Sequence, residues 1–460
     1  MNETPNNLTS RREFLKDTGR FAAASALAGV ALPHVHAAEN NTIQVALIGC
    51  GGRGGGAAVD ALSVKKGPMK LVAMADVFEH RLKSSYDALK RHKEVGRLVD
   101  VPEDRKFIGF DAYKKAMDCL KPGDVAIFAT PLAFRWVHFT YAIQKGLNVF
   151  MEKPLTADGP TSRRMIKLAG DASAKNLKVG VGLMSRHSRA LQELHQRIQD
   201  GEIGDIVLLR GYRMHGPVGS AFSEKWPGKP SELLWQIQRF HSFLWASGGC
   251  FSDFYIHHVD HLCWMKNAWP VKAQALGGRH YRENSVDQNF DNYSVEYTFA
   301  DGAKFIMDGR CIVGCEPRYY SFAHGSKGVA IVSKANDCDP PSSTYKGQNP
   351  DRAKQLWTSE VPTDQRNPYG NEWNDLVDAI RDNKPYNEVK RGVEASVVTS
   401  MGRMAAHTGQ LVTFDDMLNS KHEFAPDVDK WTMDSPAPVV ADASGKYPVP
   451  QPGRVTEREY

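Results

Sequence analysis

The chain has 460 residues, and this length predicts two domains because one hydrophobic core rarely serves more than about 300 residues. Hydrophobic residues make up 42% and charged residues 24%, an ordinary globular composition that excludes a mainly disordered chain. Seven cysteines are too few for a disulfide-framed scaffold. Lys and Arg (58) exceed Asp and Glu (53) only slightly and form no basic stripe, so we do not expect nucleic acid as a partner.

Residues 1–37 have the layout of a secretory signal. The sequence SRREFLK at residues 10–16 is followed by an apolar run from Phe21 to Pro33 and then by small residues. The apolar run is shorter than the about 20 residues that span a bilayer, which favours a signal over a membrane anchor. The paired arginines resemble the twin-arginine (Tat) signal, which implies export by the Tat machinery to the periplasm or another extracytoplasmic space. Whether the signal is cleaved or retained stays open.

A dinucleotide-binding unit is predicted directly after this segment. A buried strand from Thr42 to Ile48 precedes a Gly-x-Gly-x-x-Gly pattern and a helix from Gly56 to Leu62. Glycines at these positions allow a tight turn and a close approach of backbone to pyrophosphate, and the helix start offers free N–H groups. We expect the loop residues Gly49, Gly51, Gly52, Arg53 and Gly54 to bind the cofactor.

Asp76 supplies the acidic residue that this motif requires. It ends a second predicted strand, Lys70 to Ala75, and lies 22 residues beyond Gly54. A carboxylate at this place can bind the ribose hydroxyls and would repel a 2′-phosphate, so NAD is favoured over NADP.

Further strands and helices alternate up to a lysine at a strand end. The pattern predicts strands from Val125 to Thr130 and from Leu147 to Met151, with a helix from Ala133 to Lys145 between them. This alternation predicts a parallel, doubly wound sheet. Pro154 keeps Lys153 extended, so its side chain can project from the strand end where ligands bind such sheets. The alternative is a solvated surface lysine.

These motifs together resemble the Gfo/Idh/MocA family. The resemblance is carried by Gly49-x-Gly51-x-x-Gly54, Asp76, Thr130-Pro131 with His138, Glu152-Lys153-Pro154-Leu155, Gly248-Gly249-x-x-x-Asp253-x-x-x-His257 and a helical region at Asn371 to Leu411. It implies an N-terminal Rossmann domain at 38–155 and a C-terminal α/β domain with a large open, mostly antiparallel sheet at 156–425. It also implies a homo-oligomer. The tail at 426–460 is expected to be irregular.

The second half of the sequence supports such a sheet independently. Strands are predicted at Ile206 to Arg213, Val271 to Leu276, Asn292 to Phe299 and Lys304 to Arg310. Asp301-Gly302 is a hairpin signal between the last two. After Ala335 the composition indicates long surface loops.

The sequence DFYIHHVDH at 253–261 is the second candidate for chemistry. If it is helical, positions 253, 257 and 261 share one face, so a carboxylate can hold an imidazole one turn away. The resemblance implies that Lys153, Asp253 and His257 are catalytic, and that Thr130, Pro131, His138, Glu152 and Lys153 help bind the cofactor. A metal site is the competing interpretation, but the H-E-x-x-H pattern is absent and no metal is expected.

Candidates for substrate contacts are less specific. The positions considered are Arg186, His258 and Tyr212, and beyond them His187, Arg213, Trp245, Asp260 and His261.

The resemblance implies an NAD-dependent oxidoreductase that acts on a secondary hydroxyl of a sugar, polyol or glycoside. Because free NAD is scarce outside the cytoplasm, export predicts a tightly held cofactor that is regenerated in each cycle. One alternative is an NAD-dependent glycosidase that cleaves by oxidation, elimination, hydration and reduction. Another is a non-catalytic sugar-binding protein. Either Lys153 or His257 could be the base.

Overall fold

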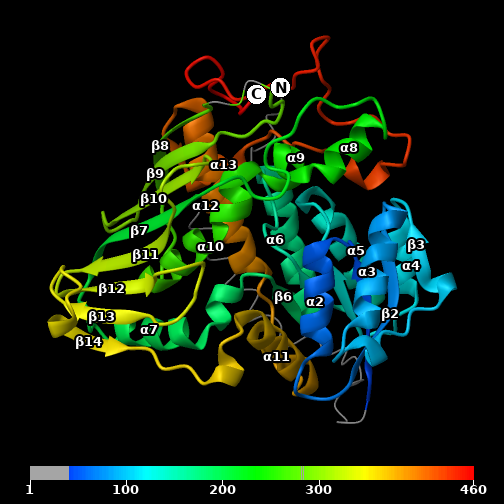
Figure 1. The fold of residues 1–460 in the computed structure, drawn as a ribbon, viewed down its shortest axis with the longest axis horizontal. Helices are drawn as coiled ribbons and strands as arrows, with labels where there is room; N and C mark the ends of the chain where they lie inside the picture. The colour runs from blue at the N-terminus through cyan, green and yellow to red at the C-terminus, as the bar shows by residue number, and fades with distance from the viewer. Residues whose placement is uncertain (1–40, 281, 283) are drawn as a thin grey trace, which may run out of the picture.

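The structure, a computed structural model, describes residues 41–280, 282 and 284–460. A parallel sheet with its helices lies beside a larger, mostly antiparallel sheet (Figure 1), as the sequence predicted. The predicted export signal at residues 1–37 lies outside the described residues. No helix in the described part of the chain has both the length and the apolar character needed to cross a membrane.

The first sheet has six parallel strands in the order β3-β2-β1-β4-β5-β6. The strands are β1 (Ile43–Ile48), β2 (Met69–Asp76), β3 (Lys106–Ile108), β4 (Val125–Phe128), β5 (Asn148–Met151) and β6 (Val179–Val181). The strand order reverses between β1 and β4, and ligands bind such sheets in the crevice at that point. β6 lies beyond residue 155, so the sheet extends past the domain end that the sequence suggested.

Helices on both faces of this sheet bury its apolar strands. They are α2 (Gly52–Leu62), α3 (Glu79–Arg91), α4 (Ala112–Asp118), α5 (Arg135–Lys145) and α6 (Gly159–Ala174). A helix from much later in the chain, α11 (Pro368–Arg381), also packs here, with the ring of Trp373 4.5 Å from that of Phe150. The C-terminal half of the chain therefore helps to bury the N-terminal sheet.

The second sheet has nine strands in the order β14-β13-β12-β11-β7-β10-β9-β8-β15. The strands are β7 (Ile206–His215), β8 (Lys272–Gly278), β9 (Asn292–Thr298), β10 (Lys304–Cys311), β11 (Arg318–Gly325), β12 (Gly328–Ser333), β13 (Ser343–Lys346), β14 (Gln355–Thr358) and β15 (Val412–Thr413). β7 and β10 pair in parallel, and every other neighbouring pair is antiparallel.

The predicted hairpin at Asp301-Gly302 is confirmed, because β9 and β10 pair antiparallel across it. The prediction of surface loops after Ala335 is incomplete, since β13 and β14 lie in that segment. Their sequences, STYK and QLWT, are short and largely polar, and the two strands pair at the edge of the sheet. Such strands carry little of the alternating pattern from which strands are recognised.

Two long helices fill the space between the sheets. α10 (Gly249–Lys266) and α12 (Val389–Thr408) pack on each other and are buried on nearly all sides. The other helices of this half are α7 (Arg189–Gln199), α8 (Glu232–Gln238), α9 (Leu244–Ser247) and α13 (Phe414–Asn419). The segment predicted to carry Asp253 and His257 on one helix face is therefore helical, and it lies at the centre of the molecule.

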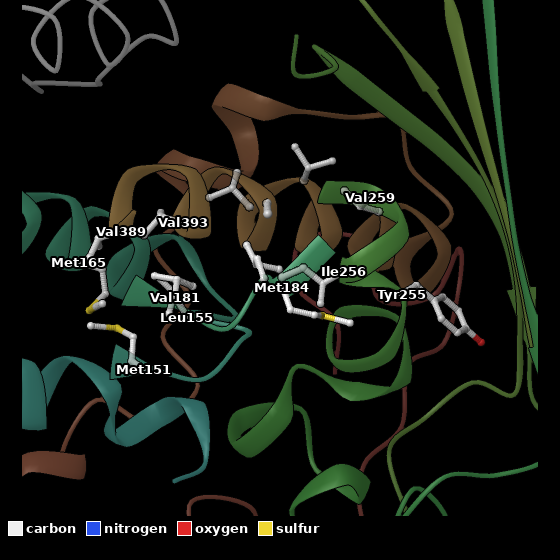
Figure 2. Close-up of a cluster of buried hydrophobic side chains, with 14 of the residues drawn as sticks. Met151, Leu155, Met165, Val181, Met184, Tyr255, Ile256, Val259, Val389 and Val393 are labelled. Atoms are coloured by element: carbon white, nitrogen blue, oxygen red, sulfur yellow. The ribbon is translucent and has the colours of Figure 1, made fainter. Parts of the chain in front are cut away.

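One continuous hydrophobic core joins the two sheets. Figure 2 shows part of it, from Met151 of β5 and Val181 of β6 on one side to Ile256 of α10 beside Met184 further along. A Cβ on Gly392 would approach the side chain of Leu155 to 2.8 Å, so α12 packs closely on the chain just after β5. This core fixes the end of β5 relative to α10.

The tail after α13 has no strand, and its only helix is a short 3-10 turn. The tail, drawn in orange and red in Figure 1, runs over α8 and α9. The ring of Trp431 lies 5.2 Å from that of Trp245, and Glu459 pairs with the fully buried Arg403 at 2.8 Å. The tail is irregular in backbone but firmly packed.

Candidate active site

The glycine-rich loop between β1 and α2 needs its glycines for steric reasons. Gly49 has a φ of +94°, which residues with a side chain rarely adopt. A Cβ on Gly54 would lie 2.0 Å from the carbonyl oxygen of Gly49, so only glycine fits there. α2 begins at Gly52 without a side-chain cap, which leaves its first N–H groups available to an anion.

A cavity of about 300 Å³ lies at the carboxyl ends of β1, β2 and β4. Its lining includes the predicted cofactor residues Gly49, Gly51, Gly52, Arg53, Gly54, Asp76, Thr130, Pro131 and His138. The other two predicted cofactor residues, Glu152 and Lys153, lie outside this lining. The opposite wall comes from the segment before α10 and includes Ile237, Phe240 and His241. The glycine-rich loop therefore faces a cavity that could accommodate a dinucleotide.

Asp76 is held at the cavity wall by the backbone. One carboxylate oxygen accepts the N–H of Cys50 at 2.7 Å, and the other accepts the N–H of Phe78 at 2.9 Å. Burial raises the pKa of Asp76 above its usual value. The two bonds orient the carboxylate at the place where the ribose hydroxyls of a dinucleotide would bind.

His138 of α5 closes the cavity beside β4. Its Nδ1 lies 3.4 Å from Thr130 Oγ1, and its ring stacks on Phe134 with centroids 6.1 Å apart. Burial and the neighbouring Arg135 lower the pKa of His138 to about 3, so the ring is neutral at pH 7. His138 therefore gives the cavity hydrogen-bonding capacity without charge.

Arg53 and Glu152 form an ion pair. Arg53 Nε lies 2.8 Å from Glu152 Oε1, and Nη2 lies 3.3 Å from Asp60. The guanidinium also lies 4.7 Å from the ring centre of Tyr369. This group ties the first turn of α2 to the end of β5, so Glu152 supports the glycine loop through Arg53.

Lys153, Asp253 and His257 come together from the two halves of the chain. Lys153 Nζ donates to the backbone carbonyl oxygen of Asp253 at 2.6 Å and lies 3.6 Å from Asp253 Oδ1. His257 follows one turn later on α10 and is only 7% exposed. Its Nδ1 has no hydrogen-bond partner among the residues that the structure describes. Burial lowers the pKa of His257 to about 4, which leaves a neutral imidazole able to accept a proton at pH 7.

Two residues that the sequence did not single out also belong to this group. His241 Nε2 lies 3.5 Å from Asp253 Oδ2. Asp337, in the loop after β12, pairs with Arg213 at 2.8 Å and lies 3.8 Å from His258 Nδ1. Neither residue belongs to a motif with recognisable spacing, so sequence alone carried no signal for them.

The predicted substrate residues differ in their surroundings. Arg186 Nη2 and Nε lie 2.8 and 3.0 Å from Asp260 Oδ1, and this carboxylate is fully buried. His258 is also fully buried, and neither ring nitrogen has a hydrogen-bond partner within the described residues. Tyr212 of β7 packs edge-on against Phe322 at 6.4 Å. Arg186 is therefore committed to a structural ion pair.

The other candidates named from the sequence are largely structural. Trp245 is 1% exposed and donates from Nε1 to Gln236 at 2.8 Å. His261 Nε2 lies 3.0 Å from Ser321 Oγ. In the part of the chain described, no group of three or more His, Cys, Asp or Glu side chains is arranged to hold a metal ion.

Residues 191–331 match a family model described as the GFO/IDH/MocA C-terminal domain. An inositol 2-dehydrogenase from Corynebacterium glutamicum is 27% identical over 133 residues, which cover 28% of this chain and 38% of that protein. An inositol 2-dehydrogenase from Leifsonia xyli is 26% identical over 101 residues, 22% of this chain and 29% of that protein. The match thus spans less than half the length of these relatives.

Solved structures resemble the chain over most of its length. An aldose–aldose oxidoreductase from Caulobacter crescentus, complexed with glycerol, has a TM-score of 0.61 at 16% identity and covers 81% of this chain and 99% of its own. A scyllo-inositol dehydrogenase from Lactobacillus casei, with bound NAD(H) and scyllo-inositol, has a TM-score of 0.59 at 19% identity with the same coverage of both chains. The chain has the fold of these proteins, and residues 191–331 resemble the Gfo/Idh/MocA C-terminal domain.

Proposed function

We propose that this protein is an NAD-dependent oxidoreductase that acts on a secondary hydroxyl of a sugar, polyol or glycoside. The observation that carries the proposal is the contact of Lys153 with Asp253, one helical turn before His257. His241, which lies 3.5 Å from Asp253, connects this contact to the cavity that the glycine loop lines. The names of the relatives, which include inositol dehydrogenases and an aldose oxidoreductase, support an oxidoreductase and a polyol or sugar substrate.

The residues present fit a dinucleotide. Because the loop residues are glycines, the loop backbone can approach the pyrophosphate closely. The start of α2 has N–H groups free to bind phosphate. The carboxylate of Asp76 is oriented toward ribose hydroxyls and disfavours a 2′-phosphate, which supports NAD over NADP. When bound, NAD would supply the acceptor for the hydride that leaves the substrate carbon.

The protein's own part in the reaction is proton transfer and orientation. As hydride leaves the carbinol carbon, neutral His257 takes the hydroxyl proton, and the carboxylate of Asp253 stabilises the resulting imidazolium. Lys153 donates to the same substrate oxygen and stabilises the negative charge that develops there. The reverse assignment, with Lys153 as the base, is the alternative that the kinetics of the two variants distinguish.

Export and a retained cofactor are part of the proposal. The twin-arginine pattern at residues 10–16 supports export in the folded state with cofactor already bound. Ile237, Phe240 and His241 cover the cavity from the second half of the chain, which supports slow release. A retained cofactor has to be reoxidised in place, so the enzyme would couple an oxidation to a reduction within one cycle.

The test uses full-length protein purified without dialysis and a panel of keto-sugars, polyols and aryl glycosides. Loss of bound reduced-nicotinamide absorbance on adding a keto-sugar supports the oxidoreductase. Release of an aglycone without net reduced cofactor would favour the glycosidase. Absence of bound nicotinamide together with no turnover on the whole panel would overturn both.

Export is tested by cell fractionation. The wild-type chain is expected outside the cytoplasm, whereas the Arg11→Lys/Arg12→Lys variant should stay inside. Equal distribution of the two chains would contradict export by the Tat route.

A further inference from the structure

The segment between β7 and α10 brings one further histidine to the site. We propose that His241 is a positioning residue that orients the Asp253 carboxylate by donating from Nε2, while its ring forms part of the cofactor cavity wall. This inference rests on the proposed function. It assigns a role to a residue outside the Lys153, Asp253 and His257 group.

The backbone fixes which nitrogen of His241 carries the proton. The N–H of Ser220 donates to His241 Nδ1 at 3.2 Å, and Ser220 Oγ lies 3.0 Å from the same nitrogen. A nitrogen that accepts an N–H has a free lone pair, so in the neutral ring the proton lies on Nε2. Nε2 faces Asp253 Oδ2 at 3.5 Å. Such a contact commonly shortens when a substrate completes the site.

The Asp253 carboxylate therefore lies between two donors. Lys153 Nζ is 3.6 Å from Oδ1, and His241 Nε2 is 3.5 Å from Oδ2. Lys153 belongs to the parallel-sheet domain, and His241 belongs to the segment that covers the cavity. The position of the Asp253 carboxylate therefore depends on how these two parts of the chain are placed relative to each other. A carboxylate with a donor beside each oxygen is restricted in orientation, and it lies one helical turn before His257.

Packing leaves the His241 ring little freedom. Its centroid lies 3.8 Å from that of Phe240 and 5.4 Å from that of Phe254. A Cβ added to Gly219 would lie 2.7 Å from Cε1 and 2.8 Å from Nδ1, and Gly219 already has a φ of +54°. The ring is thus confined from several sides, as a positioning role requires.

The charges around His241 are consistent with a neutral donor. Burial lowers its pKa, Asp253 opposes this, and Lys153, Arg239 and Arg81 add to it. Loss of the Nε2–H would remove a positive dipole from beside the Asp253 carboxylate, whose negative charge would then favour the His257 imidazolium more strongly. The acid limb of the rate profile, which we assign to His257, should then move to higher pH.

The test compares full-length His241→Phe, His241→Gln and Gly219→Ala variants on the best substrate from the panel. We expect His241→Phe to lower kcat roughly tenfold or more and to shift the acid limb upward, with a smaller change in KM. Glutamine keeps a neutral N–H donor of similar reach, so His241→Gln should restore most of kcat and the wild-type limb. Gly219→Ala displaces the ring and should shift the limb without altering the imidazole.

His324→Gln on β11 is the matched control, and NADH binding followed by fluorescence is the readout independent of turnover. Wild-type kcat and acid limb in both His241→Phe and Gly219→Ala would overturn the positioning role. Equal loss in His241→Gln and His241→Phe would also overturn it, because a donor would then not be what matters. If the wild-type protein turns over no substrate, the proposed function fails instead.

Discussion

Lys153 Nζ lies 2.6 Å from the backbone carbonyl oxygen of Asp253, although 100 residues separate the two. This bond joins the carboxyl end of β5 to α10, one element from each half of the chain. It brings an ammonium beside a carboxylate, and His241, which lines the cofactor cavity, lies 3.5 Å from that carboxylate. The arrangement is what a reaction needs when a hydroxyl proton and a hydride leave the same carbinol group.

The first prediction concerns Lys153 and His257. Lys153→Met and His257→Ala should each lower kcat/KM by roughly 10²- to 10⁴-fold, because each removes a group that moves a proton or stabilises charge. The pKa of His257 is lowered to about 4 by burial, so the wild-type rate should fall as pH decreases through about 4. A limb that disappears in His257→Ala but persists in Lys153→Met identifies His257 as the base. Near wild-type activity in both variants would end this assignment.

The second prediction concerns cofactor choice. Asp76→Ala should weaken NADH binding roughly 10- to 100-fold, because hydrogen bonds to a charged group are worth about 1.5–3 kcal/mol. It should weaken NADPH binding much less, since the repulsion of the 2′-phosphate is removed as well. Dissociation constants from nicotinamide fluorescence measure both. Asp100→Ala serves as a control, since its side chain is 62% exposed and pairs with Lys70. An unchanged ratio of the two constants would show that Asp76 does not select the cofactor.

The third prediction concerns the tail. Arg403 is fully buried and pairs with Glu459, so Glu459→Gln should lower the free energy of unfolding by about 3–5 kcal/mol. Burial raises the pKa of Glu459, but Arg403 and His407 outweigh it and lower the pKa to about 2. The stabilisation is therefore complete above about pH 4.3 and is lost as pH falls toward about 2.

Urea unfolding at several pH values measures this effect. Glu457→Gln, an exposed residue two positions earlier, is the matched control and should change stability by less than about 0.5 kcal/mol. Equal stabilities of the two variants would show that the buried pair is not what holds the tail.

The fourth prediction concerns His187, which links three segments. Its Nδ1 lies 2.6 Å from Asp375 of α11, and its Nε2 lies 3.2 Å from Glu388. Burial lowers its pKa, but these carboxylates outweigh burial and raise the pKa to about 9. The stabilisation is therefore present below about pH 6.5 and is lost as pH rises through about 9.

Unfolding experiments at about pH 6 and about pH 10 measure the loss, which can reach about 3 kcal/mol. His187→Gln should flatten this dependence, whereas His324→Gln should retain it. A wild-type protein with the same stability at both pH values would contradict the assignment of a charged His187.

The sequence by itself determined the N-terminal fold and the helix that carries Asp253 and His257. Buried strands alternating with helices predicted a parallel sheet, and the spacing of Asp253 and His257 predicted one helix face. Both are local signals, because side chains repeat every two residues on a strand and about every 3.6 on a helix. The short edge strands β13 and β14 escaped prediction because they are too brief to show a period.

Only the tertiary structure decided which charged groups meet. Sequence could not show that His241 and Asp337 lie beside the α10 residues, that Arg186 is occupied by Asp260, or that Glu459 is buried against Arg403. These contacts join segments far apart in the chain, and their distances depend on how α10 and α12 pack between the two sheets. Local periodicity sets which face of a helix is apolar, but the partner of that face is set by packing of the whole core.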